Sequence, residues 1–345
     1  SLWELTGVYA SLSRVLNNYL HEKKYYQGDY HPPVLTPEEN KKSKKSEESN
    51  PPLSASSIWL TYEALQKVNR PESETGWQFF SSSPNLAWKT GTSFGFRDGW
   101  AVGTTPQYVV GIWTGNADGE GRPGLTGITA AAPVLFDIVS LLGSDNWFNT
   151  PDEDITMISV CSKSGFRAGP DCPETVEIQA CANGLRSEAC PWHQIVHLNK
   201  AGTLQVTSDC ESPSDITNLS WFVLPPAMEY FYRQKHPEYK ILPPVAPGCP
   251  VNKNIQVMEF IYPTPGIRIF IPRDQQGLLT RIIPEIAHRN PSKMIYWHLD
   301  EKFICTTRFF HQIEIQAETG NHVLTAVDED GNSIRCLFSI IGKSV

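Results

Sequence analysis

The run Lys89-Thr90-Gly91-Thr92-Ser93 places a cation, hydroxyl side chains and a glycine at consecutive positions. The apolar residues Leu86-Ala87-Trp88 precede it, which predicts that the run continues a β-strand. Side chains alternate between the two faces of a strand, so Lys89 and Gly91 point to one face and Thr90 and Thr92 point to the other. Gly91 leaves room for another backbone or a ligand. Such a strand could bind a carboxylate, with the ammonium group supplying charge and the hydroxyls supplying direction.

Two further strands are predicted beside this run. Residues 100–103 and 108–114 are rich in apolar side chains, and Pro106 between them suits a turn. Asp98 and Trp100 lie at the start of the first of these strands. We interpret both as structural support for the turn and the sheet.

Helices are predicted on either side of the three strands. Ser1-Leu2-Trp3-Glu4 has the pattern of a capping box for a helix that reaches about Leu20. Ser56 or Ser57 is expected to cap a second helix. Residues 129–139 are expected to form a third helix with a proline in its first turn. Helices combined with an antiparallel sheet indicate an α+β unit.

The twelve residues from Lys89, Lys-Thr-Gly-Thr-Ser-Phe-Gly-Phe-Arg-Asp-Gly-Trp, resemble the third motif of penicillin-binding transpeptidases and serine β-lactamases. The resemblance extends over roughly residues 1–143 and agrees with the element order of class A penicillin-binding proteins. It implies a D,D-transpeptidase that cross-links peptidoglycan stem peptides and reacts with β-lactams. It also implies that Lys89 supports proton transfer and holds the substrate carboxylate. Thr90, Gly91 and Thr92 would complete the substrate site, with the Thr92 N–H as an oxyanion donor.

The nucleophile that this family requires is absent from the sequence. Acyl transfer needs Ser-x-x-Lys, so that the amine can accept the hydroxyl proton, and no serine here has a lysine three positions later. The second motif, Ser-x-Asn, has two formal matches, Ser83-Pro84-Asn85 and Ser144-Asp145-Asn146. Both lie at the wrong place in the chain and are interpreted as loops. We therefore expect this chain to be the C-terminal part of a longer protein and to be inactive alone.

The eight cysteines all follow residue 160. An even number in the part of the chain with the least regular pattern suggests disulfides and an oxidising compartment. Short loops close easily, and Cys305 and Cys336 are expected to face one core. The expected pairs are Cys161 with Cys172, Cys181 with Cys190, and Cys305 with Cys336.

Zinc is the competing hypothesis for the cysteines. Cys190, His193 and His197 have a Cys-x-x-His-x-x-x-His spacing. No Cys-x-x-Cys pair accompanies them, so a structural histidine is favoured and no metal is expected.

Residues 160–173, 190–198 and 221–226 resemble the segment that follows the transpeptidase in penicillin-binding proteins of the 1C type. The resemblance implies three parts: the C-terminal part of a transpeptidase domain at 1–143, a cysteine-rich connector of little periodicity at 144–248, and a small immunoglobulin-like domain at 249–345. Short alternating segments in the last part predict a β-sandwich. The predicted strands are 255–260, 267–270, 294–297, 303–305, 311–315 and 334–338.

The composition excludes some functions and leaves one alternative. A formal net charge of −8 argues against general nucleic-acid binding. No signal peptide opens the chain, and no apolar run reaches the ~18 residues of a membrane helix. We expect a periplasmic protein whose parent is anchored by an N-terminal helix, with no cofactor. The alternative is a non-catalytic module whose connector and sandwich bind cell-wall proteins or glycan.

Overall fold

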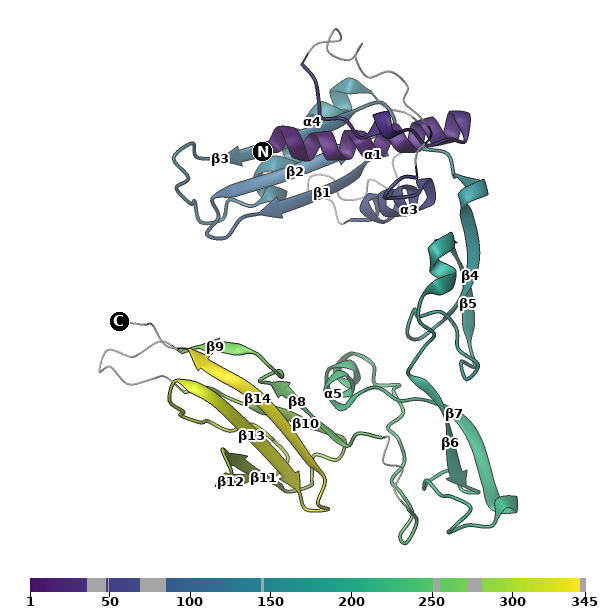
Figure 1. The fold of residues 1–345 in the computed structure, drawn as a ribbon, viewed down its shortest axis with the longest axis vertical. Coiled ribbons are helices and arrows are strands. Elements are labelled where there is room, and N and C mark those ends of the chain that lie inside the picture. Colours follow the sequence, from purple (N-terminus) through teal and green to yellow (C-terminus); the bar gives the residue numbers. More distant parts are fainter. Residues whose placement is uncertain are drawn as a thin grey trace. The chain divides into compact units, whose positions relative to one another are not determined.

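The computed structural model describes residues 1–35, 48, 50–68, 85–143, 146–250, 255–271 and 281–341. The chain forms two compact units: Ser1–Val160 with Val176–Glu188, and Cys161–Thr175 with Ala189–Val345 (Figure 1). Most of each formal Ser-x-Asn match, at 83–84 and 144–145, lies outside the described residues. Within the described ranges, no helix is long and apolar enough to cross a membrane.

The first unit is built on a three-stranded antiparallel sheet. Its strands are β1 (Ala87–Thr92), β2 (Asp98–Thr104) and β3 (Val109–Gly115), in the order β1-β2-β3. In the register of β1 with β2, Lys89 pairs with Val102. The predicted three-strand unit is therefore confirmed, and its first strand lies at the edge of the sheet.

Helices cover both faces of this sheet (Figure 1). They are α1 (Leu2–Glu22) and α3 (Ala55–Gln66) on one face, and α4 (Ala132–Leu142), preceded by the π-helix η4 (Gly127–Ala131), on the other. Ala87 belongs to the core beneath α1 and α3, whereas its neighbour Trp88 packs on Phe136 of α4 with ring centroids 5.0 Å apart. This alternation follows from the two-residue period of a strand.

The predicted helix ends are partly correct. The capping box at Ser1 is present, because its side chain accepts from the Glu4 N–H and the Glu4 side chain returns to Ser1. The cap of α3 is Ser54, which accepts from the Ser57 N–H, so the predicted caps at Ser56 or Ser57 are wrong by two or three residues.

Residues 144–248 contain more regular structure than their weak periodicity suggests. They form two hairpins and a helix, joined by short 3₁₀ turns. The elements are η5 (Asp152–Asp154), β4 (Ile155–Cys161), β5 (Thr175–Cys181), η6 (Ala182–Arg186), β6 (His193–Asn199), η7 (Pro213–Asp215), β7 (Ile216–Phe222) and α5 (Pro226–Lys235). The boundary between the two compact units falls inside this segment.

The C-terminal region is rich in β-structure, and two sheets enclose one core. The smaller sheet pairs β8 (Met258–Tyr262) with β10 (Glu285–His288). The larger has the order β12 (Lys302–Thr307), β11 (Ile295–Leu299), β13 (Gly320–Asp328), β14 (Ser333–Ile341) and β9 (Arg268–Phe270). Met258, Ile295 and Trp297 lie fully buried in the shared core. Five of the six predicted strands are confirmed.

Two strands of this region were not predicted, and one prediction was wrong. The missed strands are β10 and β13. The segment 311–315 forms no strand, only isolated bridges that pair Ile315 with Ile282 and Gln312 with Glu285.

The predicted disulfides are contradicted. The described residues contain one disulfide, Cys210–Cys249, with the Cα atoms 5.3 Å apart, and the six other cysteines are free. Cys305 on β12 and Cys336 on β14 are separated by β11 and β13. Three strand spacings amount to about 14 Å, which a disulfide cannot span. The predicted pairs Cys161–Cys172 and Cys181–Cys190 are likewise absent.

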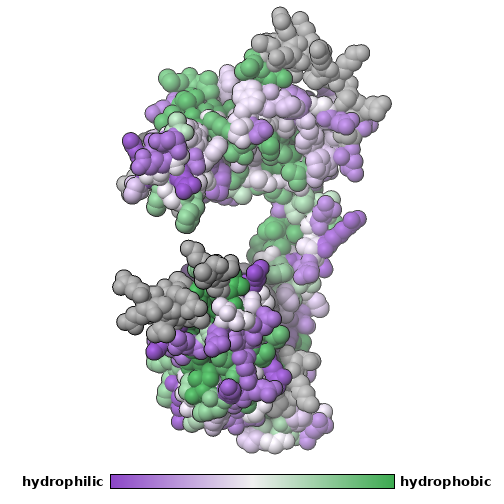
Figure 2. All heavy atoms as spheres, turned by 60° about the vertical axis from the view of Figure 1, so that its left-hand side comes forward, coloured by the Kyte–Doolittle hydropathy of each residue, from purple (hydrophilic) through white to green (hydrophobic). Residues whose placement is uncertain are grey.

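Hydrophilic and hydrophobic residues are interspersed over the faces of both units seen in Figure 2. The acidic net charge of −8 is therefore combined with a mixed surface. A net negative charge does not favour binding to a phosphate backbone.

Candidate functional site

The candidate site is the outer half of strand β1. Its inner residues, Ala87 and Trp88, are fully buried and fix the strand on both faces. From Lys89 onwards the strand becomes accessible: the lysine, Gly91 and Thr92 are exposed, and Thr90 is half-buried. The sheet therefore presents the predicted residues to solvent on a rigid support.

The backbone of β1 alternates between β2 and an open edge. The Ser93 N–H donates to the Asp98 carbonyl at 3.0 Å. In an antiparallel pair, hydrogen-bonded positions alternate, so Thr90 and Thr92 direct their N–H and C=O groups away from β2. In the described part of the chain no strand pairs with that outer edge. The Thr92 N–H is therefore available to a ligand.

Lys89 lies beside the same open edge. Its Nζ donates to the Thr90 carbonyl at 2.6 Å, which is one of the outward-facing carbonyls. The side chain is exposed, and its ammonium group retains further donors for an anion.

The Thr92 hydroxyl is oriented by a residue that sequence reasoning missed. The Gly127 N–H, at the start of η4, donates to Thr92 Oγ1 at 3.0 Å, so the hydroxyl proton remains free for an acceptor such as a carboxylate. A Cβ on Gly127 would lie 2.5 Å from the carbonyl oxygens of Gly91 and Trp100. Only glycine therefore fits at position 127. The signal in the sequence was a glycine two residues before the predicted third helix.

Gly91 behaves differently from Gly127. A Cβ on Gly91 would meet only the Trp100 Cβ, at 3.7 Å, which is an ordinary contact. The packing of the protein thus does not require glycine at position 91. Gly91 is exposed, and apart from its chain neighbours no described backbone atom lies within 4 Å of that Cβ position.

Asp98 is engaged within the sheet and the turn. Its carboxylate accepts from the Trp113 indole N–H at 2.8 Å, and its own N–H donates to Ser93 Oγ at 2.8 Å. Hydrogen bonds from Trp113 and Ser93 lower the pKa of the Asp98 carboxyl. Asp98 therefore stays ionised and tied to β3, and Trp100 lies half-buried opposite Gly91.

Several hydrogen-bond donors gather along the outer edge of β1. This edge offers a cation, an oriented hydroxyl and a free backbone donor, which suit a carboxylate and a developing oxyanion. The sequence contains no Ser-x-x-Lys motif. The donors along this edge suit the binding and orientation of an anionic ligand.

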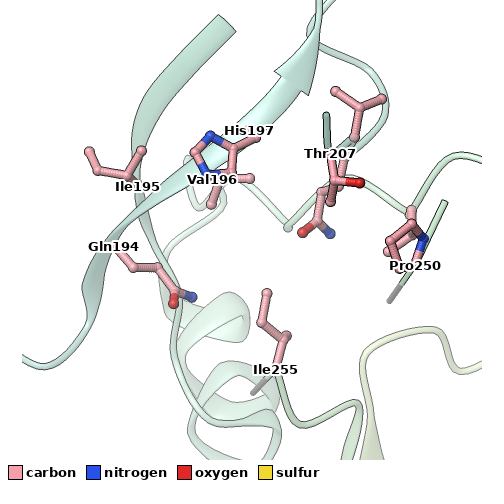
Figure 3. A pocket seen from close by; sticks show the side chains of 10 residues that line it. Gln194, Ile195, Val196, His197, Thr207, Pro250 and Ile255 are labelled. Carbon is pink, nitrogen blue, oxygen red and sulfur yellow. The ribbon is translucent and has the colours of Figure 1, made fainter. Parts of the chain in front are cut away.

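A cavity of about 250 Å³ lies in the second unit beside β6. Figure 3 shows Gln194, His197 and Ile255 among its lining side chains, none of which contains sulfur. His197 Nδ1 lies 2.6 Å from the Asn218 side-chain oxygen. Because four residues of strand span about 13 Å, His197 cannot share a metal ion with His193. The hypothetical Cys190, His193, His197 site is therefore not formed.

The C-terminal region of the chain matches a known protein family. Residues 248–339 match the family described as Penicillin-Binding Protein C-terminus Family. Over 103 residues the chain is 35% identical to "Penicillin-binding protein 1C" of Escherichia coli (strain K12), a match that covers 30% of this chain and 13% of that protein. Fibronectin(III)-like modules of Clostridium thermocellum CbhA match 25% of the chain and 95% of the module, with 14% identity and a TM-score of 0.20.

Proposed function

This chain carries a C-terminal region of the penicillin-binding protein 1C type, and on that premise we propose that β1 forms the carboxylate-binding side of a D,D-transpeptidase site. The proposed parent cross-links peptidoglycan stem peptides in the periplasm through a serine acyl-enzyme. The nucleophile belongs to a part of the parent outside these 345 residues, since no Ser-x-x-Lys occurs within them. β-Lactams would enter the same site.

Each residue of the strand has a defined task in this proposal. Lys89 contributes positive charge for the terminal carboxylate of the stem peptide and supports proton transfer from the nucleophile. The Thr92 hydroxyl, held by the Gly127 N–H, donates to that carboxylate. Thr90 lies on the same face of β1 as Thr92 and contributes its hydroxyl to the same site. The outward Thr92 N–H stabilises the oxyanion of the tetrahedral intermediate.

The observation that carries the proposal is the open outer edge of β1. An extended peptide can pair with the free N–H and C=O groups of such an edge, and this places its scissile carbonyl along the strand. The Thr90 and Thr92 backbone groups face this edge, as the Ser93 to Asp98 hydrogen bond requires.

We further propose that the chain is organised as a partial transpeptidase domain at 1–143, a connector at 144–248 and an immunoglobulin-like domain at 249–345. Continuity of the α1, β1–β3 and α4 layers supports the first part. The shared core of the two C-terminal sheets supports the last.

A second candidate function is a non-catalytic module that binds a cell-wall protein or glycan. Phe309 and Phe310 support it, because these aromatic side chains are 62% and 85% exposed. In this case β1 would play no part in chemistry.

A fluorescent penicillin distinguishes the two functions. The purified 345-residue chain is expected to show no stable covalent label after denaturing electrophoresis. A longer polypeptide that includes an upstream Ser-x-x-Lys segment is expected to become labelled, and serine replacement in that motif removes the label. Stable labelling of the short chain, or an unlabelled long chain that is folded, contradicts the proposed site.

A further inference from the structure

Four side chains from three segments of the sequence meet in the second unit. Cys161 ends β4, Cys172 lies in the loop after it, Cys190 precedes β6, and His193 is the first residue of β6. One ligand atom from each, three Sγ and one imidazole nitrogen, all lie within 4.8 Å of one another. Cys161, Cys190 and His193 are 1%, 8% and 7% exposed. The cluster is thus buried and convergent.

The separations within the cluster are those of a tetrahedral metal site. His193 Nδ1 lies 3.3 Å from Cys161 Sγ and 3.6 Å from Cys190 Sγ. Zinc–sulfur and zinc–nitrogen bonds of about 2.3 and 2.05 Å at tetrahedral angles place S and N about 3.6 Å apart. All three cysteines are free, so no sulfur pair is at disulfide distance.

A buried structural histidine does not account for this arrangement. Among the described residues His193 Nε2 has no hydrogen-bond partner. Its Nδ1 faces sulfur atoms, which are weak hydrogen-bond partners. Three thiols also cannot all be satisfied by disulfides, since pairing two leaves the third buried against the imidazole.

Surrounding groups orient the cysteine sulfur atoms. The Gly169 N–H donates to Cys172 Sγ at 3.3 Å, and Ser164 Oγ donates to Cys190 Sγ at 3.2 Å. Gly165, with a φ of 72°, allows the tight turn after Cys161, whose carbonyl accepts from the Gly165 N–H. Hydrogen bonds of this kind orient the ligands of a metal site.

We propose that Cys161, Cys172, Cys190 and His193 bind one structural Zn²⁺ ion. Four protein ligands leave no open position, which is the property of a structural rather than a catalytic site. The ion would fasten the 161–175 loop to the start of β6. This proposal replaces the expectation of no metal, and it gives three of the cysteines a role other than the predicted disulfides.

The first test is the metal content of the full chain, purified without chelator. We expect about one zinc per chain by elemental analysis. We also expect Cys161, Cys172 and Cys190 to resist alkylation until a chelator is added, whereas Cys181 reacts without it. Replacement of zinc by Co²⁺ should give thiolate-to-cobalt charge-transfer absorption and the intense visible bands of tetrahedral cobalt.

Variants with matched controls identify the ligands. Cys172→Ser is expected to reduce bound zinc by at least about tenfold, whereas Cys181→Ser, in the same segment but outside the cluster, retains it. His193→Gln is expected to lose zinc and His197→Gln to keep it. The wild-type measurements hold even if a ligand variant fails to fold. The proposal is overturned if the wild-type chain has no zinc and its Cys161 and Cys172 are joined in a disulfide, or if all six free thiols react equally with and without chelator.

Discussion

Removal of Arg289 should strongly destabilise the second unit. The Arg289 guanidinium donates to Glu229 of α5, a carboxylate that is 2% exposed. It also donates to the carbonyls of Leu224 at 2.6 Å and Gln256 at 2.8 Å. Arg289→Ala therefore removes the arginine donor from a buried carboxylate and from two carbonyls, and Glu229 keeps the Tyr239 hydroxyl as a donor at 3.1 Å.

The expected magnitude follows from the burial of the pair. Removal of one partner of a buried ion pair costs about 3–5 kcal/mol of unfolding free energy. With a urea dependence of about 2 kcal/mol per M, the midpoint should fall by about 2 M. Arg233→Ala is the matched control, since Arg233 is 3.9 Å from the same carboxylate but has a 39% exposed side chain. Its cost should be below about 1 kcal/mol.

The assay is urea unfolding, and hydrogen exchange is measured for peptides from β8 and β10 because α5 packs on these strands. Burial raises the pKa of Glu229, and Arg289 opposes this. Without Arg289 the pKa rises further, so the native state binds a proton that the unfolded state releases. The penalty of Arg289→Ala should therefore shrink as the pH falls. Equal midpoints for the two arginine variants, or a penalty that grows toward acidic pH, would refute the reasoning.

Three further perturbations test other parts of the fold. Burial lowers the pKa of His311, so the unfolded state binds more protons than the native state just below the ordinary histidine pKa of about 6.5. The free energy of unfolding therefore decreases as the pH is lowered through that range. His311→Gln should reduce this decrease in a series of unfolding free energies measured at different pH values. Gly127→Ala should lower the free energy of unfolding by about 1–3 kcal/mol, because the added Cβ overlaps two carbonyl oxygens. Gly91→Ala adds a Cβ with a contact at 3.7 Å and should melt within a few degrees of wild type. Equal losses of stability in thermal melts of the two variants would contradict this packing. Replacement of both Cys210 and Cys249 by serine removes a disulfide that closes a loop with a sequence separation of 39. On the chain-entropy estimate the free energy of unfolding should fall by about 4 kcal/mol, which denaturant titration measures. An unchanged midpoint would show that this disulfide does not stabilise the fold.

Local patterns in the sequence were sufficient to predict strand β1, its two neighbouring strands and the start of α1. The capping box at Ser1 and the three strands around Lys89 depend on neighbouring residues, and both are present. Strand β13 was missed because consecutive apolar residues, Val323-Leu324 and Ala326-Val327, hide its two-residue period, although Leu324 and Ala326 are the buried ones. Strand β10 is four residues long and gives no clear period.

Contacts between distant segments could not be predicted from the sequence. The Cys305–Cys336 pairing was inferred from shared burial, but the strand order decides the distance and keeps the thiols apart. Gly127 contacts Thr92 across 35 positions, and its role appears only when η4 is placed beside β1. The cluster around His193 likewise needs the turn geometry of the connector.

The most direct test of the central claim is the acylation rate of a longer polypeptide that carries the upstream Ser-x-x-Lys motif. Lys89→Ala is compared with Lys67→Ala, which removes another exposed lysine of the same unit. One charge-assisted contact of about 1.4 kcal/mol in the transition state corresponds to a tenfold change in rate. The proposed role predicts that Lys89→Ala slows labelling by a fluorescent penicillin at least about tenfold while Lys67→Ala leaves it unchanged. Equal rates for Lys89→Ala and the unmodified polypeptide would contradict the assignment of β1 to the site.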